Sequence, residues 1–342
     1  MNDSLKDGMK DLVSIALFVL VVACVPLVTD SGVALNFVMM ALYAALLAQA
    51  WNVLGGFGGQ FSFGHALFFG TGAYVQAIAQ VQFGVNPWLA LLLAVVAAAM
   101  VGTFVGALSF RYGLKGSYFA LVTLAFAEVF RILALSVPFT GAGSGLMVPL
   151  RESFANMQFG SRKGYLYLVL GMVAVALLAT WWLKRSRFGA YLQAVRDNEE
   201  AAQAVGVNPF RVKLGAIALS AALMGSAGAF YVQVFQYIDP AIAYGPGVSV
   251  EALVAAIVGG LGTLWGPILG AAALHLLADL TRNLFGQLPG INMVIYGVVL
   301  VGIVMFLPRG ISGIFGIAGT SGIAGVGHFV RELWARRGNN HG

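Results

Sequence analysis

Long apolar stretches recur along almost the whole chain, and they constrain the fold more than any other feature. The 342 residues are 60% hydrophobic and only 9% charged, whereas a soluble domain carries about 25% charged residues. A transmembrane helix needs about 20 mostly apolar residues, and helices satisfy their own backbone hydrogen bonds in lipid. The sequence therefore predicts an all-α integral membrane protein with about ten transmembrane helices. The candidate spans are residues 12–29, 33–54, 65–83, 87–110, 116–137, 165–183, 211–238, 248–264, 265–285 and 290–308.

The distribution of basic residues predicts how these spans are oriented. Cytoplasmic loops of membrane proteins are enriched in Lys and Arg. When the N-terminus is placed in the cytoplasm and the spans alternate, most of the 19 basic residues fall on the cytoplasmic side. Both termini are then cytoplasmic, with residues 1–312 as a single transmembrane domain and residues 313–342 as a basic tail. The net charge of +6 reports topology on this interpretation, and no nucleic-acid partner is predicted.

The predicted cytoplasmic loop 184–213 concentrates charge that the rest of the chain lacks. We predict a short amphipathic helix over residues 187–205, ended by Gly206 in the left-handed conformation. Such a helix fits three roles: it lies on the membrane surface, connects two spans in solvent, or docks onto a soluble partner. The apolar residues that recur on one face are Leu192, Val195, Ala202 and Val205. The charged residues are Arg196, Asp197, Glu199 and Glu200.

A motif in this loop favours docking. Glu200-Ala201-Ala202-x-x-x-Gly206 resembles the EAA-x-x-x-G loop of ATP-binding cassette (ABC) importer permeases, although Ser220 stands where that loop usually has Pro in a following I-x-L-P. Five segments occur in the expected order: LGGFGGQFSFGHALFFGTGAY (54–74), GSYFALVTLAFAEVFR (116–131), RSRFGAYLQAVRDNEEAAQAVGVN (185–208), VGGLGTLWGPILGA (258–271) and FLPRG (306–310). Together they resemble the permeases of branched-chain amino acid ABC importers, specifically the longer M-type subunit, over roughly residues 35–312.

The resemblance implies a transport function and a set of partners. It implies a permease domain over residues 1–312 that moves leucine, isoleucine and valine across the bacterial inner membrane by alternating access. The implied partners are a second permease of the H type, two cytosolic ATPases, a periplasmic substrate-binding protein and membrane lipid. The chain has no G-x-x-x-x-G-K-[ST] motif, so we expect no ATP or other cofactor on this subunit.

The resemblance also implies that residues 187–206 are a coupling helix that fits a cleft in an ATPase. Arg196, Glu199 and Glu200 would make the charged contacts, and Gly206 would set the exit turn. Leu192, Val195 and Val205 would make the apolar contacts. The coupling residues are thus Arg196, Asp197, Glu199, Glu200, Ala201, Ala202 and Gly206.

Two glycine-rich segments interrupt the apolar pattern on the same predicted side of the membrane. Residues 55–65 place Gln60, Ser62 and His65 among glycines, where polar groups are costly unless they face protein or water. Two interpretations fit: a broken helix at the translocation pathway, or tight packing with Ser62 capping the next helix. His65 alone fits a structural hydrogen bond or a proton relay. The glycines expected to break helices are Gly58, Gly59, Gly64, Gly259, Gly260 and Gly262.

Charged residues inside the spans are the remaining candidates. Glu128 and Arg131 lie three apart on one face of a span, where they either pair with each other or line the pathway. An ion-coupled secondary transporter that uses Glu128 is the alternative from another class, and permeases for urea, short amides or other small solutes are the nearest rivals. No nucleophile–base pair or metal-ligand cluster is recognisable, so we predict no catalytic or metal site and no enzyme activity.

Overall fold

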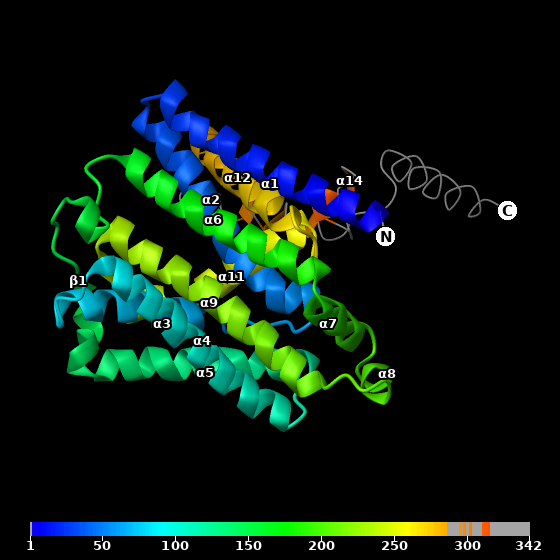
Figure 1. Ribbon diagram of the computed structural model, residues 1–342. Coiled ribbons are helices and arrows are strands. Elements are labelled where there is room, and N and C mark those ends of the chain that lie inside the picture. Colours follow the sequence, from blue (N-terminus) through cyan, green and yellow to red (C-terminus); the bar gives the residue numbers. More distant parts are fainter. Residues whose placement is uncertain (1, 286–293, 296, 299–300, 303–309, 315–342) are drawn as a thin grey trace.

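The computed structural model describes residues 2–285, 294–295, 297–298, 301–302 and 310–314, and long helices dominate it (Figure 1). The long helices are α1 (Asn2–Val28), α2 (Gly32–Asn52), α3 (His65–Val81), α4 (Pro87–Arg111), α5 (Gly116–Ser136), α6 (Arg162–Arg185), α9 (Pro209–Phe235), α11 (Pro246–Gly259) and α12 (Gly266–Phe285). The shorter elements are the π-helical turn η1 (Val53–Phe57), α7 (Arg187–Asp197), α8 (Glu199–Ala204), α10 (Pro240–Tyr244), α14 (Gly310–Ile314), the 3-10 turns η2 (Pro138–Thr140), η3 (Ala142–Ser144) and η4 (Phe154–Asn156), and the strands β1 (Leu146–Met147) and β2 (Tyr237–Ile238).

Seven helical segments of the described residues are long and apolar enough to cross a membrane, so the prediction of a helical multi-pass membrane protein is confirmed. They are Gly8–Val28, Gly32–Phe57, Pro87–Arg111, Gly116–Ser136, Arg162–Arg185, Pro209–Phe235 and Pro240–Gly259. Helix α3, with 17 residues, and helix α12, with 20, are not among these seven segments. The predicted span 290–308 and nearly all of the predicted tail lie outside the described residues. The total of ten spans therefore stays a prediction.

Buried helices form the centre of the bundle, where α9 packs against both α2 and α3. Glycines bring α3 and α9 into backbone contact: a Cβ on Gly72 would lie 2.2 Å from the carbonyl oxygen of Gly225, and one on Gly228 would lie 2.1 Å from that of Phe69. Helices in lipid associate mainly through van der Waals packing, because the hydrophobic effect does not drive them together there. Glycine increases this packing by letting the two backbones approach closely.

The two ends of the bundle differ in character (Figure 1). One end carries α7 and α8, and Asp11 near the start of α1 pairs there with Lys184 and Arg185 at the end of α6. The other end carries the antiparallel pair of two-residue strands β1 and β2. The loop expected on the cytoplasmic side and the first span's N-terminal end thus lie together.

Two predicted spans have clearly different boundaries in the structure, and the first of them, predicted over residues 12–29, lies in a helix that begins at Asn2. We expected a helix over residues 248–264, but α11 begins at Pro246, directly after α10, and ends at Gly259. Proline is favoured in the first helical turn because its missing N–H is not needed there. Gly260, with φ of 121°, takes a backbone conformation that other residues rarely adopt, and this ends the helix.

Candidate functional site

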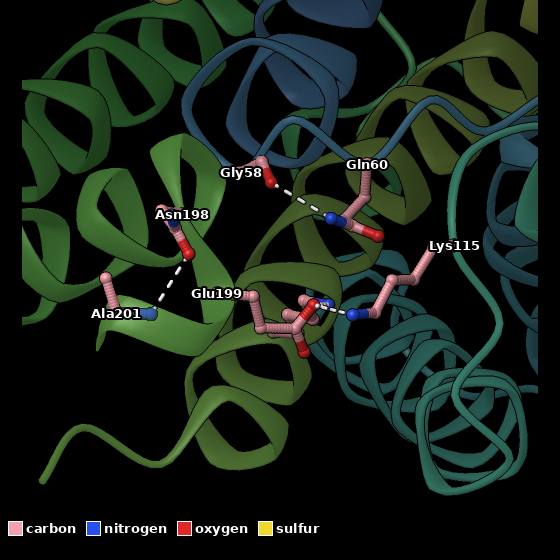
Figure 2. Close-up of polar contacts among 7 residues, drawn as sticks. Gly58, Gln60, Lys115, Asn198, Glu199 and Ala201 are labelled. Atoms are coloured by element: carbon pink, nitrogen blue, oxygen red, sulfur yellow. Dashed lines mark hydrogen bonds and ion pairs between the residues drawn. The ribbon is translucent and has the colours of Figure 1, made fainter. Parts of the chain in front are cut away.

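The charged loop predicted as one helix over residues 187–205 is two helices, which corrects the prediction. The hydroxyl of Ser186 accepts a hydrogen bond from the Gly189 N–H (3.0 Å) and starts α7. Asn198 then leaves helical geometry, and its Oδ1 accepts a hydrogen bond from the Ala201 N–H (3.0 Å) to start α8 (Figure 2). Asparagine is favoured as a helix N-cap over a helix interior, which explains the division.

The apolar residues of the loop mostly face the chain itself. Leu192 and Val195 of α7 are 0% and 3% exposed, and Ala202 of α8 is 4% exposed. Val205, by contrast, is 81% exposed. The expectation that Leu192 and Val195 contact an ATPase is therefore corrected, because both side chains are already buried. Val205 remains available to a partner.

Glu199 anchors α8 to two other parts of the chain. Its Oε2 lies 2.8 Å from Nζ of Lys115, just before α5, and 2.9 Å from Nζ of the buried Lys213 in α9 (Figure 2). Partial burial raises the pKa of the Glu199 carboxyl, but the hydrogen bonds from Lys115 and Lys213 outweigh this, so that its pKa lies below the ordinary value. The same contact raises the pKa of Lys115. Glu199 was predicted to touch an ATPase, yet its charge is paired within the chain.

The other predicted coupling residues differ in whether they face solvent or the helix bundle. Asp197, Glu200 and Ala201 are exposed on the surface of the loop. Gly206 is also exposed and has φ of 89°, so its predicted left-handed conformation is confirmed. Arg196 turns toward the bundle: its Nη1 donates to the Gly56 carbonyl (3.0 Å), while its Nε donates to Asp197 Oδ1 (3.1 Å).

The first glycine-rich segment breaks the helical path between α2 and α3. After the π-helical turn η1 the chain is non-helical until His65. The Trp51 Nε1–H donates to the Ser62 carbonyl at 2.8 Å, and the Ser62 hydroxyl accepts from the Gly64 N–H at 3.2 Å. Gln60 donates to the Gly58 carbonyl at 3.3 Å (Figure 2). We call residues 53–64 the first break.

His65 lies at the start of α3 in a buried, hydrogen-bonded position. The Ser220 hydroxyl donates to the Ala50 carbonyl (2.7 Å), so its oxygen accepts the proton of His65 Nε2 (2.9 Å). Ser249 of α11 accepts from the Ala66 N–H at 2.7 Å and caps α3 from another helix. His65 is fully buried, and this arrangement agrees with a structural hydrogen bond.

The second glycine-rich segment, residues 260–265, separates α11 from α12, and we call it the second break. It lies against the first. Asn52, the last residue of α2, accepts from the Gly262 N–H at 2.8 Å and donates to the Thr263 carbonyl at 3.0 Å. A Cβ on Gly56 would lie 2.5 Å from the Gly262 nitrogen, so the two backbones touch where glycine is present on both sides.

Glu128 and Arg131 pair with each other. Arg131 donates from Nε to Oε2 (2.8 Å) and from Nη2 to Oε1 (2.6 Å) of Glu128. The pair faces outward: the Glu128 side chain is 48% exposed and that of Arg131 is 31% exposed. The hydrogen bonds between the two side chains do not involve the first or the second break. In particular, neither residue is hydrogen-bonded to Gln60, Ser62 or His65.

Four polar residues of this region were not predicted: Asn52, Asn198, Lys213 and Ser220. Asn52 carried a signal, because an amide in a long apolar span needs a protein partner. Asn198 precedes Glu-Glu-Ala-Ala, a sequence typical of a helix N-terminus. Lys213 and Ser220 gave no signal, since their partners lie far away in the chain. Among the described residues, no three His, Cys, Asp or Glu side chains gather as metal ligands.

The fold is that of a multi-pass helical membrane protein with a polar loop at one end of the bundle. Comparison with known families makes this specific: residues 33–304 match the family described as branched-chain amino acid transport system, permease component, and the chain belongs to it. The matched range agrees with the resemblance found over residues 35–312.

Individual relatives lie in the same family. The chain is 29% identical over 327 residues to the high-affinity branched-chain amino acid transport system permease protein LivM of Salmonella typhimurium, covering 88% of this chain and 75% of that one. It is 24% identical over 302 residues to the permease LivH of the same bacterium, covering 81% and 94%. It is 31% identical over 151 residues to the nucleoside ABC transporter permease NupC of Lactococcus lactis, covering 41% and 46%.

Proposed function

We propose that this chain is one of two permease subunits of an ABC importer that carries branched-chain amino acids across the inner membrane of a bacterium. The observation that carries the proposal is the loop between α6 and α9. It presents an exposed acidic helix start and an exposed Val205, and it is tied firmly to the bundle behind them. That combination suits a surface that receives force from a partner and passes it to the spans.

The docking surface of the proposal is α8 with the turn that follows it. Glu200, Gln203 and Val205 point to solvent, and the acidic residues stand at the helix N-terminus, where their charge is favoured. A shallow cleft beside them is lined in part by Lys115, Gln203 and Gly206. A cytosolic ATPase that binds here would place the N-terminus of α1 on the same, cytoplasmic side.

A second permease is proposed against the outer face of α5. Glu128 lies on the same exposed stripe as Leu121, Leu124 and Ile132. A charged pair in the middle of a span is expensive when it faces lipid, and Arg131 reaches toward Glu128 rather than along the helix toward the membrane surface. The exposed face of α4, with Val95, Val96 and Met100, carries no such charge and suits lipid.

Two alternative functions can be compared with this proposal. Partial identity to a nucleoside permease makes nucleosides a rival substrate within the family, beside urea and short amides. An ion-coupled transporter using Glu128 is less well supported, since two hydrogen bonds from Arg131 occupy both oxygens of that carboxylate. A proton relay needs a carboxyl that can exchange its proton.

The proposal is tested by gentle purification of the tagged chain from native membranes, followed by identification of the chains that come with it. We expect a second permease and ATPases, ATP hydrolysis, and leucine uptake after reconstitution with a binding protein. Glu200→Lys should release the ATPases, because it reverses an exposed charge on the docking surface. Glu152→Lys, the same reversal in an exposed loop between β1 and α6, should retain them.

Isolation of the chain without any ATPase would contradict the proposal, as would uptake that follows an ion gradient in the absence of ATP. Uptake of nucleosides or amides instead of leucine would keep the ABC permease role and replace the substrate.

A further inference from the structure

The first and second breaks form one joint at the end of the bundle that carries α7. Asn52 pairs with the backbone of the second break through two hydrogen bonds, at 2.8 and 3.0 Å. The backbones of Gly56 and Gly262 leave no room between them for a side chain. A shift of either break therefore has to move the other, and with them the ends of α2 and α11 and the starts of α3 and α12.

Helix α7 rests on this joint through two residues that are one turn apart. Leu192 packs on Gly58, where an added Cβ would lie 3.3 Å from Leu192 Cδ1. The stem of Arg196 covers Gly59, where an added Cβ would lie 2.4 Å from Arg196 Cγ. Residues four apart face the same side of a helix, so both contacts belong to a single face of α7.

Arg196 bonds to the first break through its guanidinium, which also lies beside the second break. Its Nη1 donates to the Gly56 carbonyl in the π-helical turn at 3.0 Å. A Cβ on Gly262 in the second break would lie 3.3 Å from the same nitrogen. The guanidinium thus lies over the point where the breaks meet, and a hydrogen bond from a charged donor is about twice as strong as a neutral one.

We propose that Arg196 is the positioning residue that transmits movement of the ATPase-docking loop to the joined helix breaks, and that it does not itself hold the ATPase. This rests on the proposed function. Movement of α8 shifts α7, Arg196 carries the shift to the Gly56 carbonyl, and the joint changes the relative tilt of four membrane helices. Glycine at position 59 leaves room for the aliphatic stem of Arg196, and glycine at position 262 leaves room beside its guanidinium.

The test compares Arg196→Gln with Arg187→Gln in the native complex. Arg187 is exposed at the first position of α7, so its variant removes the same charge from the same helix without touching the joint. Two quantities are measured: leucine uptake per ATP hydrolysed in proteoliposomes, and maleimide labelling of Phe61→Cys with and without ATP and vanadate. Phe61 is an exposed residue of the first break, and replacing the single cysteine, Cys24, by serine removes background labelling.

We expect Arg196→Gln to keep its ATPases and hydrolyse ATP, while uptake per ATP falls about tenfold, the equivalent of one charge-assisted hydrogen bond. The ATP-dependent change in labelling at position 61 should disappear in this variant and persist in Arg187→Gln. Arg196→Lys keeps the charge but not the planar fork and takes the place of Arg196→Gln if that variant does not accumulate.

Two results would overturn the inference. Unchanged uptake per ATP would show that the joint moves without Arg196, and loss of the ATPases from the purified complex would make Arg196 a docking residue. Failure of the proposed function is separate, because it would appear in the wild-type complex as the absence of ATPases or of ATP-driven uptake.

Discussion

Helices α7 and α8 are neighbours in one loop, yet they differ in what they leave exposed. Leu192 and Val195 of α7 are buried in the bundle, whereas Val205 directly after α8 is 81% exposed. Asn198 separates the two helices, so each can orient its own face. The difference indicates a division of labour, in which α8 offers a surface to a partner and α7 carries that surface's movement into the membrane helices.

The largest effect should come from a change that lifts α7 off the bundle. A Cβ on Gly189 would lie 1.6 Å from the backbone carbonyl oxygen of Leu183. We therefore expect Gly189→Ala to lower stability by about 3 kcal/mol through overpacking, measured as the thermal unfolding midpoint in detergent. Ala190→Val, one residue along on the exposed side, is the control. Equal midpoints for the two variants would mean that α7 is not tightly seated.

Truncation of one apolar residue of α7 and of the one directly after α8 compares the two surfaces. Leu192→Ala should cost about 3 kcal/mol of stability because it leaves a cavity, and it should leave the docking surface intact. Val205→Ala should change stability by less than about 0.5 kcal/mol but weaken ATPase retention during purification. The comparison breaks down if Val205→Ala retains the ATPases as wild type does.

The residue that divides the helices should have a smaller effect. Asn198→Ala removes the cap of α8 and should cost about 1 kcal/mol, seen as faster hydrogen exchange over residues 199–204. Asn198→Asp keeps a capping oxygen and should behave like wild type. Unaltered exchange in Asn198→Ala would show that the Glu199 ion pairs alone hold α8.

The smallest effect concerns pH. Because the folded pKa of Glu199 lies below its ordinary value, its contribution to stability is complete above the unfolded pKa of about 4.3. It is lost only as pH falls through the lower folded value. The stability difference between wild type and Glu199→Gln should thus be constant from about pH 8 to pH 5 and shrink in stronger acid. A difference that already declines near neutral pH would contradict the three-residue contact.

Much of this arrangement could be predicted from local patterns. Apolar runs predicted the membrane helices, glycine clusters predicted both helix breaks, and the three-residue spacing of Glu128 and Arg131 allowed for their ion pair. The left-handed Gly206 followed from its place after a short helix. These features depend on residues close together in the sequence, where spacing determines geometry.

Features set by distant contacts could not be predicted. The amphipathic pattern of residues 187–205 identified an apolar face, but it could not say that the face meets the same chain rather than an ATPase. Glu199 was visible as a charge, whereas its partners Lys115 and Lys213 come from other loops and helices. The hydrogen bond of Arg196 to Gly56, and its place beside Gly262, join residues that are far apart in the sequence.

The central claim is that the residues after α8 touch an ATPase in the working complex. A photo-reactive amino acid in place of Val205 tests it most directly, with irradiation in native membranes and identification of the adduct. The account predicts a covalent adduct with an ABC ATPase that changes in yield when ATP is trapped, and no such adduct from the buried position of Val195. Adducts with lipid alone at position 205 would contradict it.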